Sequence, residues 1–157
     1  MKLKKYQEGA IERLEEFLKL LKKLKPKLAF HELTDKTYNH DWFNDVPFVC
    51  IKIPTGGGKT LVGCKAVESV YDSFLQHKSE TGIVMWFVPS EAIKSQTLRK
   101  LKDRNDMHRK ILDESFQNSI KIFSNEEALR IRKEDVENNL CIIISSLDAF
   151  RKEKSLQ

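Results

Sequence analysis

Three glycines followed by a lysine and a threonine are the residues of this sequence whose spacing most clearly suggests chemistry. Glycine has no Cβ, so it lets consecutive backbone N–H groups turn inward around an anion. The helical pattern that starts at Lys59 would present its positive end to the same anion. Lys59 can reach the outer phosphates of a nucleotide, and the Thr60 hydroxyl can ligate Mg²⁺, which makes these two the catalytic candidates. The stretch therefore predicts a site for ATP and Mg²⁺, whose phosphate cradle comprises Pro54, Thr55, Gly56, Gly57, Gly58, Lys59 and Thr60.

The elements around this stretch have to hold it in place. Apolar residues at 47–53 predict a short strand that Pro54 ends, and the helix after the glycines fades near residues 77–80. A continuous apolar run at 83–88 predicts a strand buried on both faces. Further strands are predicted at 119–123 and 140–144, with helices between them at 91–101 and 125–133. This alternation predicts an α/β, three-layer domain with a mainly parallel sheet, whose ligands lie at the carboxyl ends of the strands.

The first 45 residues are different in character. Residues 3–24 carry apolar side chains at intervals of three and four, which predicts one amphipathic helix. Residues 25–45 are polar and predict a connecting loop, which Trp42 and Phe43 would pin onto the domain.

The glycine-rich stretch resembles motif I of the superfamily 2 helicases, in its form Pro-Thr-Gly-x-Gly-Lys-Thr. Ile53 stands where the full P-loop pattern has its first glycine. Upstream, Tyr6-Gln7 is similar to the Q motif of the same superfamily. The resemblance implies that the Gln7 amide reads the adenine edge, with Tyr6 packed near the base. It also implies a RecA-like P-loop fold, to which residues 1–157 contribute the N-terminal portion: a Q-motif helix (1–24), a connecting loop (25–45) and the P-loop core (46–157).

Two strand ends resemble the nucleic-acid contacts of that superfamily. Pro89-Ser90, followed by Gln96, looks like motif Ia, in which helix N–H groups and a hydroxyl hold the backbone phosphates of a strand. Ser146 stands at the second such position. The alternative is simple helix capping, because serine is a preferred N-cap.

The block Val-Pro-Phe-Val-Cys-Ile-Lys-Ile at 46–53, read with motif I and with Trp-Phe-Val-Pro-Ser at 86–90, most resembles the Res (helicase/translocase) subunit of type III restriction enzymes. This resemblance implies an ATP-driven motor on double-stranded DNA, partnered by a methyltransferase (modification) subunit, with a nuclease domain further along the chain.

No Asp-Glu pair follows an apolar strand, although a P-loop NTPase needs such a residue to hold Mg²⁺ and to orient water. We therefore expect an apparently incomplete domain that does not hydrolyse ATP alone. Two alternatives remain open: a fragment of a repair or RNA helicase, and a stand-alone nucleotide- or nucleic-acid-binding module without ATPase activity.

The overall composition bears on the partners and the location of the protein. A net charge of +5 permits an acidic partner, and a cluster of basic residues between 99 and 110 either follows a phosphate backbone or is a solvated helix face. No apolar run is long enough to cross a membrane. Cys50, Cys64 and Cys141 lack metal-ligand spacing and predict buried free thiols, which together favour a cytoplasmic protein.

Overall fold

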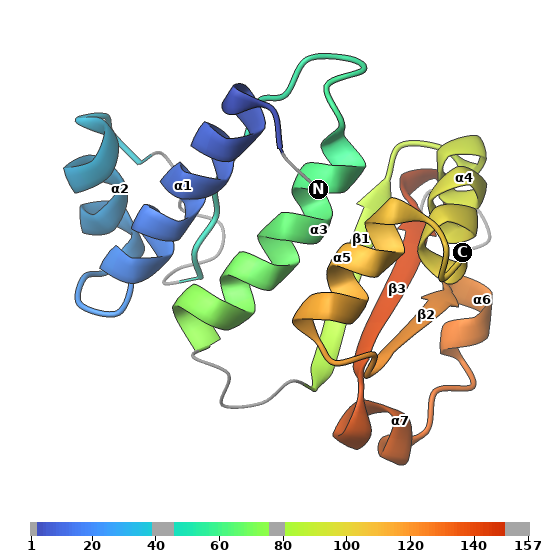
Figure 1. Ribbon diagram of the computed structural model, residues 1–157. Helices are drawn as coiled ribbons and strands as arrows, with labels where there is room; N and C mark the ends of the chain where they lie inside the picture. Colours follow the sequence, from blue (N-terminus) through green and yellow to red (C-terminus); the bar gives the residue numbers. More distant parts are fainter. Residues whose placement is uncertain (1–2, 39–45, 76–80, 150–157) are drawn as a thin grey trace, which may run out of the picture. The chain divides into compact units, whose positions relative to one another are not determined.

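The computed structural model describes residues 3–38, 46–75 and 81–149 (Figure 1). The chain divides into two compact units, residues 1–77 and residues 78–157. The first unit contains the glycine-rich turn and the second contains a β-sheet. The α/β class and the parallel sheet predicted from the sequence are both confirmed.

Three helices and one π-helical turn make up the described part of the first unit. They are α1 (Lys5–Leu20), α2 (Pro26–Thr34), α3 (Lys59–Ser69) and η1 (Val70–Leu75). The apolar stripe of α1 is buried, as its spacing predicts, through Ile11, Leu14, Phe17 and Leu18. Burying side chains of this size contributes about 1.5–3 kcal/mol each. Phe17 also packs edge-on against Phe30 of α2, with ring centroids 6.4 Å apart.

The predicted helix over 3–24 is too long, and the predicted loop over 25–45 contains a helix. The cause is Pro26, which fixes its own φ and excludes the helical conformation for the residue before it. Lys25 is accordingly extended, with φ −64° and ψ 154°, and Pro26 starts α2. The chain therefore turns between α1 and α2. Trp42 and Phe43, expected to pin the loop, lie outside the described residues.

The strand predicted at 47–53 is not formed, since these residues have no regular secondary structure. A strand is stable only when its backbone N–H and C=O groups pair with another strand. Here the Phe48 N–H instead donates to the hydroxyl of Tyr38, at 2.7 Å. An apolar run between two prolines was therefore not enough to define a strand.

The second unit is built on three parallel strands, β1 (Gly82–Val88), β2 (Ile120–Ser124) and β3 (Leu140–Ser146), in the order β1-β3-β2 (Figure 1). Central β3 is buried along its whole length. Its Ile142 pairs with Val84 on one side and with Ile122 on the other. The three predicted strands at 83–88, 119–123 and 140–144 are thus confirmed within one or two residues.

The helices of this unit are α4 (Glu91–Lys102), α5 (Met107–Ser115), α6 (Asn125–Ala128) and α7 (Lys133–Asn138). Helix α4 packs against all three strands. The helix predicted at 125–133 stops at Ala128, and a separate helix, α7, begins at Lys133. Beyond Ala128 no apolar face continues into the core, and Leu129 is 90% exposed. None of the described helices combines the length and the apolar composition that crossing a membrane requires.

Two burial predictions are wrong. The β1 strand is not buried on both faces: Ile83, Met85 and Phe87 are about half exposed, while Val88 is buried. Alternate side chains of a strand point to opposite faces, so this pattern is that of a strand covered on one face. Of the three cysteines, Cys50 is exposed, because the predicted strand around it is absent.

Candidate functional site

The glycine-rich turn has the backbone geometry that only glycine adopts without strain. Gly56 and Gly58 have positive φ angles of 75° and 78°. The Gly57 N–H donates to the Pro54 carbonyl at 3.0 Å, which closes the turn. A Cβ at Gly57 would lie 2.8 Å from that same carbonyl oxygen, so the position has no room for a side chain. The three glycines are thus required by the shape of the turn.

Helix α3 starts directly after this turn, and no side chain caps it. Its N-cap is Gly58, and its first turn holds no acidic residue. The first N–H groups of a helix have no partner within the helix, and its dipole adds partial positive charge there. Lys59 and Thr60 are the first two helical residues, so both lie beside this positive end. The glycine turn and the two candidate catalytic residues therefore lie next to each other, and their roles toward phosphate and Mg²⁺ stay predictions.

The Lys59 side chain is folded back onto the turn. Its Nζ donates to the Pro54 carbonyl at 3.0 Å, although the side chain is exposed. A hydrogen bond to an exposed carbonyl is readily exchanged for a stronger one to a phosphate oxygen. The ammonium group thus lies against the turn, held by one exposed hydrogen bond.

The N-terminus of α1 is hydrogen-bonded to the same turn. The Tyr6 hydroxyl and the Gln7 Nε2 both donate to the Gly57 carbonyl, at 3.0 Å and 2.8 Å. The Gln7 Oε1 accepts the Lys4 N–H at 2.9 Å, and the Gln7 side chain is buried. Both ends of the Gln7 amide are therefore used inside the protein. The pairing of Gln7 with adenine implied by the resemblance remains a prediction, and it requires this amide to exchange its partners.

Three of the predicted nucleic-acid residues, Pro89, Ser90 and Ser146, lie at the carboxyl ends of β1 and β3. Val88 at the end of β1 pairs in register with Ser146 at the end of β3. Ser90 caps α4, and its Oγ accepts the N–H of Ile93 at 3.5 Å. Pro89 is exposed beside it. The capping alternative for Ser90 is thus observed, and capping leaves the outer face of this turn open.

Gln96 and Ser146 differ in accessibility. Gln96 is exposed on the second turn of α4. Ser146 is fully buried; its Oγ donates to a carboxylate oxygen of Glu91 and accepts the N–H of Ala149 at 3.2 Å. The Ser146 hydroxyl is therefore occupied by the protein, and of these two residues Gln96 is the one presented to solvent.

Sequence reasoning missed the charged cluster that joins these strand ends. Lys94 is buried, with its Nζ 2.7 Å from Glu91 and 3.0 Å from Glu126. Hydrogen bonds from Lys94 and Ser146 hold the pKa of Glu91 below its ordinary value. Burial by itself lowers the pKa of Lys94, but its hydrogen bonds to Glu91 and Glu126 outweigh this and raise it. The Glu91–Lys94 spacing of three residues was visible in the sequence, whereas the contact with Glu126 was not.

The basic cluster at 99–110 does not form a continuous positive stripe. Arg109 is buried and paired with Asp113 at 2.8 Å. Lys102 is paired with Glu127 at 2.7 Å. Two of its basic residues are therefore paired within the protein, whereas Arg99, Arg104 and Lys110 are exposed.

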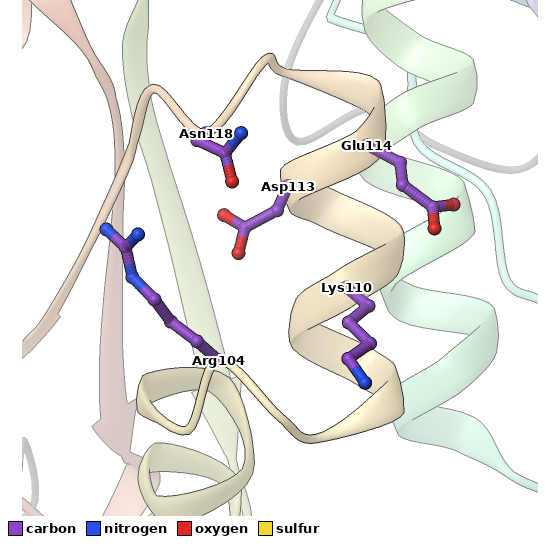
Figure 2. Close-up of a pocket in the computed structure, with 5 residues that line it drawn as sticks. All are labelled: Arg104, Lys110, Asp113, Glu114 and Asn118. Carbon is purple, nitrogen blue, oxygen red and sulfur yellow. The ribbon is translucent and has the colours of Figure 1, made fainter.

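A shallow polar hollow lies beside that segment (Figure 2). Its volume is about 270 Å³, and it is lined by Arg104, Lys110, Asp113, Glu114 and Asn118. Figure 2 shows Asp113 and Glu114 on the same helix, α5, with their side chains pointing different ways. This Asp-Glu pair therefore does not stand at the end of a strand, where an NTPase would need it. Within the described residues, no three His, Cys, Asp or Glu side chains are grouped so that they could hold a metal ion.

Comparison with known families gives a match over the whole chain. The family described as type III restriction enzyme, res subunit, matches residues 1–157. The chain belongs to this family. No curated protein matches the chain, and no solved structure does. Membership of the res subunit family indicates an ATP-dependent, helicase-like module, for which the start of α3 is the predicted phosphate cradle.

Proposed function

We propose that this chain is the ATP-binding portion of a DNA helicase/translocase that belongs to a type III restriction endonuclease. The observation that carries the proposal is the glycine turn joined to the uncapped start of α3, found in a chain of the res subunit family. Such a turn offers backbone N–H groups and a helix dipole to the β- and γ-phosphates of ATP. The finer assignment, to a restriction endonuclease acting on double-stranded DNA with a modification subunit, is supported by the family match alone.

Each residue of the cradle has a separate task in this proposal. Lys59 leaves the Pro54 carbonyl and pairs with the outer phosphates. Thr60, on the first turn of α3, offers its hydroxyl to Mg²⁺. The backbone N–H groups from Gly56 to Lys59 surround the phosphate oxygens. Mg²⁺ held there would neutralise part of the phosphate charge, with the Thr60 hydroxyl as its ligand from this segment.

Hydrolysis of ATP requires a residue in addition to those of the cradle. An acidic residue has to hold Mg²⁺ from the end of another strand and orient the attacking water. The described strands end in Val88, Ser124 and Ser146. We therefore expect the 157-residue chain to bind ATP without appreciable turnover.

The carboxyl end of the sheet is the proposed place for DNA. Pro89, Ser90 and Gln96 form its accessible part. The start of α4 can direct N–H groups at a backbone phosphate, and an exposed glutamine can donate to the next. Ser146 would contact the DNA backbone only after its hydroxyl gives up its hydrogen bond to Glu91.

The test is a titration of the chain with a fluorescent ATP analogue in the presence of Mg²⁺. We expect a dissociation constant of about 1 µM or weaker, and a loss of about tenfold or more in Lys59→Ala, which is about 1.4 kcal/mol. Lys52→Ala is the matched control, since Lys52 is also exposed and precedes the turn by two residues. Equal affinity of Lys59→Ala and the unchanged chain would show that Lys59 does not contact the nucleotide. If neither protein binds the analogue, the proposed function is refuted.

A further inference from the structure

The carbonyl group of Gly57 is held by two donors from the start of α1. The Tyr6 hydroxyl donates to it at 3.0 Å, and the Gln7 Nε2 donates to it at 2.8 Å. A backbone carbonyl oxygen has two lone pairs, so both are used by these side chains. Gly57 itself is buried. The direction of its carbonyl is therefore determined by α1.

The direction of the Gly57 carbonyl also determines that of the Gly58 N–H. Both groups belong to one planar peptide unit, and the described chain contains no cis peptide bond. In a trans unit the C=O and N–H bonds point in opposite directions, so the Gly58 N–H points away from Tyr6 and Gln7. Within the described residues no group accepts a hydrogen bond from this N–H. It is thus available to a ligand.

The Gly58 N–H lies where the proposed function needs a donor. Gly58 is the N-cap of α3 and directly precedes Lys59. The N–H groups of this turn are those that would surround phosphate oxygens. A hydrogen bond to the carbonyl of a peptide unit also polarises the unit, which makes its N–H a stronger donor. The donors on Gly57 therefore both orient and strengthen one N–H of the cradle.

The two donors differ in their other contacts. The Gln7 side chain is buried, and its Oε1 accepts the Lys4 N–H at 2.9 Å, so Gln7 also shapes the start of α1. Tyr6 is 43% exposed. Among the described residues, Gly57 is the one that its hydroxyl bonds. The Tyr6 hydroxyl can therefore be removed without altering the hydrogen bonds of the helix start.

We propose that Tyr6 is a positioning residue for the phosphates of the nucleotide: its hydroxyl holds the Gly57 carbonyl and so directs the Gly58 N–H at a phosphate oxygen. This inference rests on the proposed function, because it assumes that the glycine turn holds phosphate. The superfamily resemblance implies instead that Tyr6 packs near the base. Packing would depend on the ring and positioning depends on the hydroxyl, so the two roles are separable.

Tyr6→Phe removes the hydroxyl and keeps the ring. Tyr38→Phe is the matched control, because its hydroxyl accepts the Phe48 N–H at 2.7 Å and makes no hydrogen bond to the glycine turn. The probe is inorganic tripolyphosphate with Mg²⁺, which has a chain of phosphates and no base. Its dissociation constant is measured by displacement of the fluorescent ATP analogue. We expect this constant to rise about fivefold in Tyr6→Phe, as for the loss of one hydrogen bond, and less than about twofold in the control.

A second measurement observes the Gly58 amide directly. The chain has six glycines, so a sample that carries isotope-labelled glycine gives a simple NMR spectrum. Loss of the hydrogen bond at the Gly57 carbonyl changes the polarisation of the peptide unit, so the Gly58 amide resonance should shift in Tyr6→Phe. It should not shift in Tyr38→Phe. A purely structural role of Tyr6 would lower the unfolding midpoint without this selective shift.

Each outcome has a distinct meaning. Equal affinity of Tyr6→Phe and the unchanged chain for tripolyphosphate overturns the positioning role and leaves the proposed function intact. A loss of affinity for the ATP analogue alone also overturns it, because the hydroxyl would then act on the nucleoside. An unshifted Gly58 resonance in Tyr6→Phe overturns it as well. If the unchanged chain binds neither the analogue nor tripolyphosphate, the proposed function is refuted, and the positioning role with it.

Discussion

Replacing Gly58 by alanine tests how the glycine turn and α1 depend on each other. Gly58 has a φ of 78°, and an alanine held in the left-handed region costs about 1–2 kcal/mol. Its Cβ would also lie 2.6 Å from the Gln7 Nε2. The Gln7 amide is the end of a flexible side chain, so it would move away and give up its hydrogen bond to Gly57. Losing that bond costs about 1 kcal/mol.

We therefore expect Gly58→Ala to lower the free energy of unfolding by about 2 kcal/mol, after allowing for the smaller entropy of the unfolded alanine chain. Urea denaturation followed by circular dichroism measures this change. Hydrogen exchange of α1 and α3 locates it, since both helices contact the altered turn. Gly9→Ala is the matched control: its Cβ would meet nothing within 4 Å, inside α1. Alanine there should stabilise the chain by up to about 1 kcal/mol.

A double-variant cycle with Gln7→Ala separates the two contributions. When Gln7 is already absent, Gly58→Ala should cost only the left-handed conformation, about 1 kcal/mol less than in the unchanged chain. The reasoning is refuted if Gly58→Ala is as stable as the unchanged chain. It is also refuted if its cost is the same with and without Gln7, because the contact between them would then contribute nothing.

Three further predictions concern the second unit. Arg109→Met should lower the free energy of unfolding by about 3–5 kcal/mol in urea denaturation, because it leaves Asp113 buried without its charge partner. The control Arg13→Met breaks an exposed ion pair and should cost less than about 1 kcal/mol. Equal costs of the two variants would contradict the burial argument. Ser124→Ala removes the capping box of α6 and should cost about 1 kcal/mol by the same assay, and no change would show that this short helix needs no cap. Hydrogen bonds led by that of Ser124 lower the pKa of Glu126 to about 2 from an ordinary 4.5, so its stabilising contribution is complete above pH 4.5 and is lost as the pH falls towards 2. Unfolding midpoints at pH 6 and pH 3 should therefore differ less in Glu126→Gln than in the unchanged chain, and an equal or larger difference would contradict the sign.

Local backbone geometry was the part of this protein that the sequence predicted well. The phosphate cradle depends on residues that follow one another, so the positive φ angles of Gly56 and Gly58 and the position of Lys59 follow from adjacent residue types. The strands at 83–88 and 140–144 could also be predicted, because short continuous apolar runs of that length are typical of strands in a sheet.

Features that depend on distant partners were not predictable in the same way. Residues 47–53 have the composition of a strand, yet a strand needs a neighbour, and composition does not reveal whether one is present. The buried cluster around Lys94 draws Glu126 from a position 32 residues away, for which the sequence offers no signal. Ser146 looked like a contact for nucleic acid, but its hydroxyl is used by Glu91.

The Gly57 carbonyl shows how the two halves of the candidate nucleotide site are linked. It accepts hydrogen bonds from both Tyr6 and Gln7, so the segment that would read the base is attached to the turn that would hold the phosphates. If Gln7 pairs with adenine, its amide must leave Gly57 and Lys4, which costs about 0.5–1.5 kcal/mol for each bond. Two hydrogen bonds to an adenine edge repay that cost, whereas a pyrimidine, which presents a different edge, repays less of it. If adenine is the base bound, we therefore expect selectivity for it, because a base that cannot replace these hydrogen bonds would leave the Gln7 amide bonded to Gly57 and Lys4.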